Sequence, residues 1–276
     1  MLPKLGILAG NGELPSRLIR ACRQQDRDFF VIAFEDQTPA DLVADTPHAW
    51  VRLGAAGKAV ALLRGAGVQE VVMAGSLHRP SIAALRPDLW AAKVLAKAGA
   101  RAWGDDGLLS AIVHELEEGE GFRVVAPESL LPGELATPGS YGRISPDDQA
   151  KSDIARGIVI AQALGRLDVG QGVVVQQGLV LAVEASEGTD AMLARCKNLS
   201  REGPGGVLVK VRKPGQERRV DLPTIGVGTV KAAAAAGLRG IAVEAGGALV
   251  IDREGVAGAA DKVGLFVVGV ASEKRD

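Results

Sequence analysis

Four side chains with oxygen ligands lie close together in the sequence, at the end of a predicted β-hairpin. In LDVGQGVVVQQGLVLAVEASEGTD, β-branched runs on either side of the Gln177-Gly178 turn are typical of two antiparallel strands. The hairpin returns the chain to the edge where it began, and it brings there Glu184, Glu187, Thr189 and Asp190. Oxygen ligands clustered at a strand end are suited to binding a hard cation or to phosphate chemistry.

A single carboxylate, Asp221, stands in the otherwise apolar segment VDLPTIG, just before a predicted helix. A buried, unpaired carboxylate is costly, and helix capping at Thr224 does not account for it. We therefore expect Asp221 to act in catalysis or as a metal ligand. Five cations precede it and form either a solvated loop or a clamp for phosphate groups. They are Lys210, Arg212, Lys213, Arg218 and Arg219.

A glycine turn near the N-terminus is the main candidate for a phosphate contact. GILAGNGELP reads as a strand, a Gly-x-Gly turn and a helix start, an arrangement that presents backbone N–H groups to phosphate. Pro15 stands where the dinucleotide fingerprint has its third glycine, which weakens a nicotinamide or flavin interpretation. We expect Gly10, Asn11 and Gly12 to contact the substrate, with a purely structural turn and a dinucleotide site as alternatives.

Further candidate substrate contacts lie in three other segments. Gly75 and Arg79 belong to AGSLHRP, a loop that follows an apolar strand, where an open sheet binds its ligands. Asp105 and Asp106 begin a predicted helix in GDDGLL, where capping is the alternative explanation. In the C-terminal half the expected contacts are Thr189 and Lys210.

The elements that must position these residues alternate between strand and helix in the first half of the chain. Such alternation predicts an α/β fold with a Rossmann-like, doubly wound parallel sheet. The expected strands are 4–9, 29–34, 49–53, 70–74 and 122–126, and the expected helices are 13–25, 56–66, 88–98 and 105–118.

A Pro- and Gly-rich stretch, 129–146, interrupts this alternation and marks a linker. The second half contains the hairpin as well as crossover units, so we expect a C-terminal α/β domain with a mixed sheet. The expected organisation is an N-terminal domain at 1–130, a linker at 131–146 and a catalytic domain at 147–276. Its predicted helices are 146–164, one after the hairpin through Met192, 228–236 and 254–263. Its predicted strands outside the hairpin are 206–212, 240–244, 248–252 and 265–270.

Composition excludes several classes of protein. The chain has 276 residues and a net charge of -1, which gives no electrostatic basis for non-specific nucleic-acid binding. Cys22 and Cys196 have no metal-site spacing, and we expect both to be reduced and buried. The longest uncharged apolar stretch, 169–183, is shorter than the ~20 residues that span a bilayer. With no signal peptide, a cytoplasmic protein is expected, in contact with a membrane at most at its surface.

Seven motifs occur in an order that covers nearly the whole chain. They are LGILAGNGELP, AGSLHRP, GDDGLL, DVGQG, EGTDAML, RVDLPTIG and AGLRGIAVEAGGALVIDRE. Together they resemble the LpxI family of UDP-2,3-diacylglucosamine pyrophosphatases. The resemblance implies hydrolysis of UDP-2,3-diacylglucosamine to UMP and 2,3-diacylglucosamine 1-phosphate (lipid X) in lipid A biosynthesis. It also implies Mg²⁺ as the cofactor, substrate bound between the two domains and a homodimer. Peripheral contact with the inner membrane is a further expectation.

The family's essential aspartate corresponds to Asp221, and attack of water on the β-phosphorus is implied by the resemblance alone. Magnesium needs only one or two carboxylates besides substrate oxygens and waters, so Asp221 with Glu187 or Asp190 would suffice. We expect these three acids to be catalytic, and Asp221 and Glu187 to bind the metal. The alternatives are an NAD(P)-dependent oxidoreductase that uses the Gly10–Gly12 turn and a nonenzymatic nucleotide-sugar binding protein.

Overall fold

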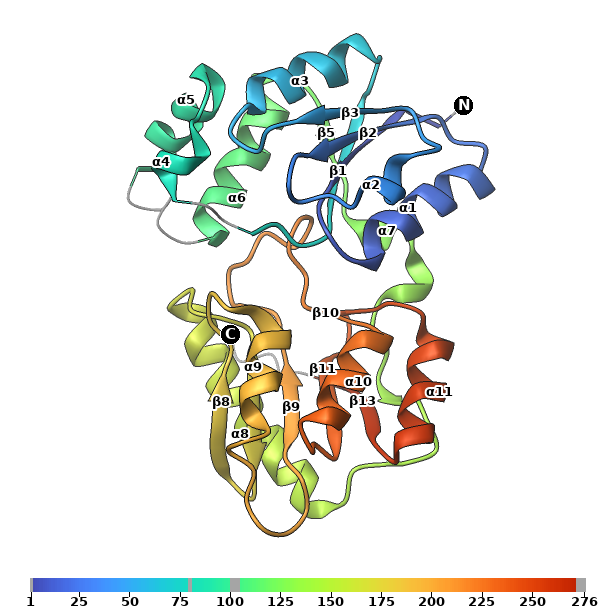
Figure 1. Ribbon diagram of the computed structural model, residues 1–276, viewed down its shortest axis with the longest axis vertical. Helices are drawn as coiled ribbons and strands as arrows, with labels where there is room; N and C mark the ends of the chain where they lie inside the picture. The colour runs from blue at the N-terminus through green and yellow to red at the C-terminus, as the bar shows by residue number, and fades with distance from the viewer. Residues whose placement is uncertain (1, 79–80, 100–104, 272–276) are drawn as a thin grey trace. The chain divides into compact units, whose positions relative to one another are not determined.

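The chain forms two compact α/β units in a computed structural model that describes residues 2–78, 81–99 and 105–271 (Figure 1). Unit 1 comprises Met1–Pro132 and Glu217–Asp221, and unit 2 comprises Gly133–Gln216 and Leu222–Asp276. The first division point lies within the expected linker, 131–146. The short segment Glu217–Asp221 was expected in the C-terminal domain, but its contacts group it with unit 1.

Unit 1 is built on a five-stranded parallel sheet with the order β3-β2-β1-β4-β5. Its central strands β1 and β2 are apolar on both faces, as in sheets that helices cover on two sides. The strand order reverses at β1, so the topological switch point lies between β1 and β4. The strands are β1 (Leu5–Ala9), β2 (Phe29–Phe34), β3 (His48–Val51), β4 (Glu70–Ala74) and β5 (Arg123–Val124).

Helices of unit 1 pack against this sheet. Buried side chains of α3 and α6 join those of β2 and β4 in one core cluster, while α1 contacts β1 and α7 (Figure 1). Val220, from the segment Glu217–Asp221, packs against the same cluster. The helices are α1 (Glu13–Gln24), α2 (Ala40–Val43), α3 (Ala56–Gly65), α4 (Ile82–Leu85), α5 (Leu89–Ala98), α6 (Asp105–His114) and α7 (Pro127–Leu130).

One predicted helix, 105–118, changes its winding along its length. The α-helix ends at His114, and a π-helical turn, η2 (Glu115–Gly119), continues the chain. Glu115 is only 2% exposed and accepts hydrogen bonds from Lys93 and Lys97 of α5, both at 2.6 Å. Two ammonium groups thus compensate a buried carboxylate, which the local sequence pattern of an amphipathic helix does not reveal.

Unit 2 contains a six-stranded mixed sheet with the order β6-β13-β11-β9-β7-β8 and a separate parallel pair, β10 and β12. Both findings agree with the predicted mixed α/β domain. The strands are β6 (Gly139–Ser140), β7 (Gly172–Gln176), β8 (Leu179–Val183), β9 (Val207–Lys210), β10 (Thr224–Ile225), β11 (Gly240–Glu244), β12 (Leu249–Val250) and β13 (Phe266–Val270). The main helices are α8 (Asp148–Arg166), α9 (Gly188–Cys196), α10 (Val227–Ala235) and α11 (Arg253–Val263), and a 3-10 turn, η3 (Pro132–Glu134), joins the units.

Alternate residues of this sheet enter two different core clusters, as the period of two in a strand requires. Val173 and Val209 pack with α8, whereas Val174 and Leu208 pack with buried side chains of α9, α10 and α11. Gly157 lets α8 approach β9 closely, because a Cβ atom there would lie 2.5 Å from Val209 Cγ2. The sheet is therefore covered on both faces, which explains its uninterrupted valine-rich strands.

The predicted hairpin is confirmed, with β7 and β8 antiparallel around Gln177 and Gly178. Both turn residues have positive φ, as a tight two-residue hairpin turn needs. The Asp153 carboxylate on α8, 1% exposed, accepts hydrogen bonds from the backbone N–H groups of Gln177 (3.0 Å) and Gly178 (2.6 Å).

Two other expectations concern single residues and membrane spans. Cys22 and Cys196 are both buried and free, as expected. In the part of the chain that the structure describes, no helix combines the length and the apolarity needed to cross a bilayer.

Candidate functional site

The loops after β1 and β4 meet at the switch point of unit 1. Gly10 donates to Ala74 O at 2.8 Å, and Asn11 and Ser76 exchange two backbone hydrogen bonds, at 2.8 and 2.9 Å. A Cβ atom at Gly75 would lie 2.5 Å from Asn11 O, and Gly75 has a φ of +88°. The predicted substrate residues Gly10, Asn11 and Gly75 are thus brought together by backbone contacts that leave no room for larger side chains.

Helix α1 begins directly after this contact, and the N–H groups of Glu13 and Leu14 in its first turn have no acceptor within the helix, whereas Pro15 has no N–H. Its N-cap, Gly12, has a φ of 103° and makes no side-chain cap. A Cβ atom at Gly12 would meet nothing within 4 Å, so the backbone there borders open space. Asn11 accepts the Gly12 N–H at 2.8 Å through its own Oδ1. The start of α1 therefore has the geometry and the dipole direction for binding an anionic group.

Three other predicted contacts of unit 1 are less defined. Arg79 lies outside the described residues. Asp105 is the first residue of α6, as predicted, but its side chain also lies outside the description. Asp106, in the first turn of α6, is half-buried and makes a polar contact.

In unit 2 a buried polar network joins the ends of β8 and β9. Thr189 Oγ1 donates to Glu184 Oε1 at 2.5 Å and accepts from Lys210 Nζ at 2.6 Å. The Lys210 ammonium lies 3.8 Å from the Glu184 carboxylate, and the two residues are 4% and 7% exposed. Both strands run antiparallel to β7, so their carboxyl ends share one edge of the sheet.

This network contains a buried carboxylate oxygen that can accept a further hydrogen bond. Glu184 Oε2 has no hydrogen-bond partner among the described residues. Gly172 provides the space for it, since a Cβ atom there would lie 2.5 Å from the same oxygen. Glu184 was grouped with the hairpin acids in the sequence but not assigned to the site. Its position at a strand end, three residues closer to the sheet than Glu187, was the available signal.

The other two hairpin acids lie away from this network. Glu187 and Asp190 are exposed, at the start of α9. Glu187 Oε1 accepts from Arg195 at 2.8 Å, and this hydrogen bond lowers the pKa of Glu187 below its ordinary value. Of the predicted hairpin cluster, the structure thus brings together Glu184 and Thr189, and it places Glu187 against Arg195 instead.

Asp221 ends the segment that unit 1 receives from the second half of the chain. The sequence suggested a buried carboxylate in an apolar environment, but Asp221 is half-buried and makes a polar contact. The apolar residues on either side of Asp221 do not bury it, because they pack in different units. Val220 packs against the core cluster of unit 1, whereas Leu222 and Pro223 are buried in unit 2, and Asp221 is the last residue of the segment that belongs to unit 1.

The five cations between 210 and 219 do not act as one set. Lys210 is engaged by Thr189, and Lys213 Nζ pairs with Asp168 at 2.7 Å. Arg219 pairs with Glu117 and Glu217, at 2.7 and 2.9 Å. Most of the charge is therefore already balanced by protein carboxylates, which weakens the interpretation of a five-residue phosphate clamp.

No preformed metal centre is recognisable among the described side chains, where no three His, Cys, Asp or Glu residues group together as potential ligands. Magnesium does not require such a group, because it commonly binds through one or two carboxylates plus substrate oxygens and waters. The proposed ligands Asp221 and Glu187 belong to different units and offer the oxygen donors that magnesium prefers.

Comparison with known proteins identifies related sequences over the whole chain. Residues 4–133 match the LpxI N-terminal domain and residues 137–268 match the LpxI C-terminal domain. UDP-2,3-diacylglucosamine pyrophosphatase LpxI of Caulobacter vibrioides is 46% identical over 282 aligned residues, covering 99% of both chains.

Solved structures with detectable similarity are much more distant. A UDP-glucose 4-epimerase from Thermus thermophilus in complex with NAD is 16% identical, covers 99% of this chain and 88% of its own, and has a TM-score of 0.33. CobK precorrin-6A reductase is 14% identical, covers 98% and 90%, and has a TM-score of 0.32. At these scores the resemblance carries no argument about function.

Proposed function

Because the chain belongs to the LpxI family, we propose that it hydrolyses UDP-2,3-diacylglucosamine to UMP and lipid X in lipid A biosynthesis. The observation that carries this proposal is the 46% identity to the Caulobacter vibrioides pyrophosphatase over 99% of both chains. The chemistry of the site is compatible with a diphosphate substrate, as follows.

The diphosphate is proposed to bind at the switch-point loops of unit 1. Gly12 borders open space at the start of α1, so its following N–H groups are available to phosphate oxygens. Gly10, Asn11 and Gly75 hold this loop in place through backbone contacts. Arg79, Asp105 and Asp106 are proposed as further substrate contacts.

Unit 2 is proposed to contribute Lys210 and Thr189 to the same substrate. The Lys210 ammonium is fixed by Thr189 and Glu184, so its charge is held at a defined position. A fixed cation favours the charge that develops on phosphate oxygens during P–O cleavage, and it needs no reorganisation at that moment. Glu184, through its contacts to both, is the residue that orients them.

Magnesium is proposed as the cofactor, held by Asp221 and Glu187 together with substrate oxygens. When bound, it would neutralise charge on the diphosphate. We propose that Asp221 orients the attacking water and accepts its hydrogen bond, with Asp190 as a further catalytic acid. The water oxygen forms a bond to the β-phosphorus, and the bond from that phosphorus to the bridging oxygen breaks. UMP leaves with the bridging oxygen, and the water oxygen remains in lipid X.

We also propose that the protein is a cytoplasmic homodimer with peripheral contact to the inner membrane, where a diacylated substrate resides. Light scattering after gel filtration tests the dimer, and sedimentation with anionic lipid vesicles tests the membrane contact. A monomeric mass, or protein that stays entirely in the supernatant, contradicts the respective part.

The function is tested by incubating purified protein with UDP-2,3-diacylglucosamine, with magnesium or with a chelator, and following UMP and lipid X by phosphorus NMR. We expect stoichiometric UMP and lipid X only with magnesium. In water enriched in oxygen-18, the label is expected in lipid X, and label in UMP would place the attack on the α-phosphorus. Binding without product release would favour a nonenzymatic binding protein. A bound nicotinamide cofactor would favour the oxidoreductase.

A further inference from the structure

Asp221 lies at the end of a short segment that has no helix or strand to hold it. The chain enters unit 1 after Gln216 and leaves it after Asp221, and residues 218–220 form only a turn. Its position is therefore set by side-chain contacts rather than by backbone pairing. Besides the polar contact of Asp221 itself, the neighbouring residues Val220 and Arg219 make one apolar and one polar contact.

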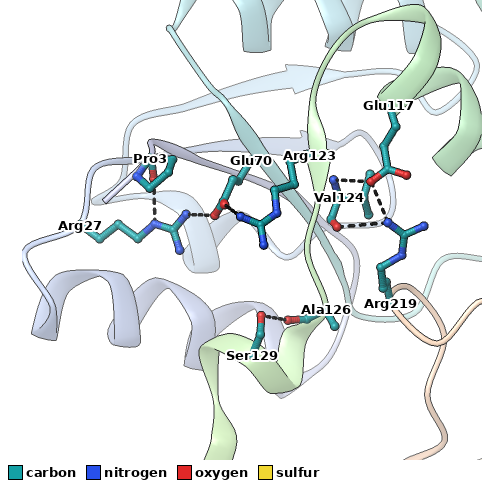
Figure 2. A network of polar contacts seen from close by, with 9 residues as sticks. All are labelled: Pro3, Arg27, Glu70, Glu117, Arg123, Val124, Ala126, Ser129 and Arg219. Atoms are coloured by element: carbon teal, nitrogen blue, oxygen red, sulfur yellow. Dashed lines mark hydrogen bonds and ion pairs between the residues drawn. The ribbon is translucent and has the colours of Figure 1, made fainter. Parts of the chain in front are cut away.

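The polar contact joins Arg219 to three groups of unit 1, of which Figure 2 shows Glu117 and Val124. The guanidinium donates to Glu117 Oε1 at 2.7 Å, to Val124 O at 3.5 Å, and to both carboxylate oxygens of Glu217, at 3.0 and 2.9 Å. Glu117 is itself fixed, because its Oε1 also accepts the Val124 N–H at 3.2 Å. The contacts therefore run from strand β5 through the π-helical turn to Arg219.

Arginine suits this position for a geometric reason. Its planar group donates several hydrogen bonds in fixed directions and can satisfy two carboxylates at once, which a lysine cannot do with the same geometry. The hydrogen bonds to Glu217, and then to Glu117, raise the pKa of Arg219 above its ordinary value, although burial opposes this. The Arg219 guanidinium is thus already paired with two carboxylates, which makes it a poor partner for phosphate.

The apolar contact reinforces the polar one. Val220, the next residue, packs against the core cluster of unit 1 that contains Val124 and Leu116. Arg219 and Val220 thus anchor the two positions directly before Asp221. A carboxylate that follows two anchored residues has few backbone conformations left to it.

We propose that Arg219, paired with Glu117, is a positioning residue that fixes Asp221 on unit 1. The catalytic part of this inference rests on the proposed function, in which Asp221 orients water. The anchoring part does not, because it concerns only where residues 217–221 are held. A misplaced group near the reacting atoms can lower turnover by about 100-fold, so loss of the anchor is expected to reduce kcat rather than substrate affinity.

The test compares three variants with wild type: Arg219→Gln, Arg219→Lys and Glu117→Gln. The matched control is Arg123→Gln, which removes another arginine–carboxylate pair of unit 1, Arg123 with Glu70 (Figure 2). Glu70 keeps a second, buried partner in Arg27 at 2.5 Å, so this control is expected to fold and to retain activity. Thermal unfolding of every variant verifies that the fold is retained.

The first readout is steady-state UMP release. Arg219→Gln and Glu117→Gln are each expected to lower kcat by about 10- to 100-fold with KM changed by less than about threefold. Arg219→Lys is expected to keep more of the wild-type kcat than Arg219→Gln. In the double variant Arg219→Gln/Glu117→Gln, the loss of transition-state stabilisation is expected to be smaller than the sum of the two single losses. An unchanged kcat in Arg219→Gln, or an equal loss in the Arg123→Gln control, would overturn the positioning role.

The second readout needs no activity. Hydrogen exchange of the peptide covering 217–221 is expected to accelerate at least about tenfold in Arg219→Gln and Glu117→Gln, and not in the Arg123→Gln control. Unchanged exchange would overturn the anchor itself. If wild type releases no UMP, the proposed function fails, and exchange alone decides whether the segment is anchored.

Discussion

The two units place their candidate residues at the same kind of location but use different chemistry there. In unit 1 the loops after β1 and β4 contain backbone groups and glycines, with Gly10 and Gly75 in close contact. In unit 2 the ends of β8 and β9 carry charged side chains, Glu184 and Lys210, that are buried against each other. Backbone N–H groups can bind an anion although they carry no net charge. A buried charged side chain, in contrast, needs an oppositely charged partner within the protein.

The difference follows from where each unit needs its glycines. In unit 1, glycine excludes side chains so that two loops can touch. In unit 2, Gly172 makes space for the Glu184 carboxylate, and so admits a side chain rather than excluding one. A glycine at a strand end therefore predicts that another group approaches its Cα closely in both units. The identity of that group, a backbone carbonyl in unit 1 and a carboxylate in unit 2, cannot be predicted from the glycine.

The largest effect on turnover is expected at Asp221, which belongs neither to the loops after β1 and β4 nor to the ends of β8 and β9. Asp221→Asn is expected to lower kcat by at least about 100-fold while the free energy of unfolding stays within about 1 kcal/mol, because the half-buried side chain keeps its shape. Phosphorus NMR of UMP release and urea unfolding measure the two quantities. Retained turnover would remove Asp221 from the proposed mechanism.

The charged edge of unit 2 is expected to depend on Lys210 for stability as well as for function. Lys210→Met leaves Glu184 buried without its cation, and we expect a loss of about 3 kcal/mol in urea unfolding. Lys210→Met combined with Glu184→Leu removes both charges and should recover most of that stability, but not activity. If the single variant is as stable as wild type, the ion pair contributes no net stability in this unit.

The backbone edge of unit 1 is expected to respond to size rather than to charge. Gly75→Ala places a Cβ atom 2.5 Å from Asn11 O at a φ of +88°, and about 1–3 kcal/mol of unfolding free energy should be lost. UMP release should fall with it, since the loop must shift. The matched control is Gly65→Ala at the end of α3, where a Cβ atom meets nothing and stability is expected to rise slightly. Equal stabilities of the two variants would contradict the close contact.

The smallest effect concerns acid stability, to which a buried carboxylate of unit 1 is expected to contribute. Hydrogen bonds from Lys93 and Lys97 lower the pKa of the buried Glu115 in unit 1 below its ordinary value of 4.5. A lowered carboxyl pKa stabilises the fold above the unfolded value, and the contribution is lost as the pH falls through the folded value. Urea unfolding is expected to show reduced stability below about pH 4.5, and Glu115→Gln should flatten this dependence. A pH dependence identical to that of wild type would exclude Glu115 as its source.

Local features of the fold were predictable where the sequence pattern itself determines them. The strand at 29–34 is a continuous apolar run and that at 70–74 is apolar after Glu70, while the Gln177-Gly178 turn follows from its residue types. The π-helical turn at Glu115–Gly119 was not predictable, because it accommodates a carboxylate whose partners lie on another helix. The helical periodicity of a sequence reports on a single helix. It does not indicate that lysines 18 to 22 residues earlier in the chain will pair with Glu115.

The candidate site shows the same limit. The glycine turn after β1 is a local pattern and could be identified directly. The pairing of Arg219 with Glu117 joins residues 102 positions apart, and that of Lys210 with Thr189 joins residues 21 apart. Neither the charge run at 210–219 nor the acids after the hairpin indicates which cation meets which oxygen, because long-range pairing is decided by the packing of whole elements.

The Asp153 carboxylate beneath the hairpin turn has a consequence for how unit 2 assembles. If β7 and β8 paired one residue out of register, the N–H groups at the turn would move away and leave this buried carboxylate with the Gln149 amide as its remaining donor. Helix α8 therefore selects a single register for two strands that are otherwise repetitive in valine and leucine. The hairpin and α8 should consequently gain their native structure in one cooperative step, because the hydrogen bonds of Asp153 form only when both elements are in their native positions.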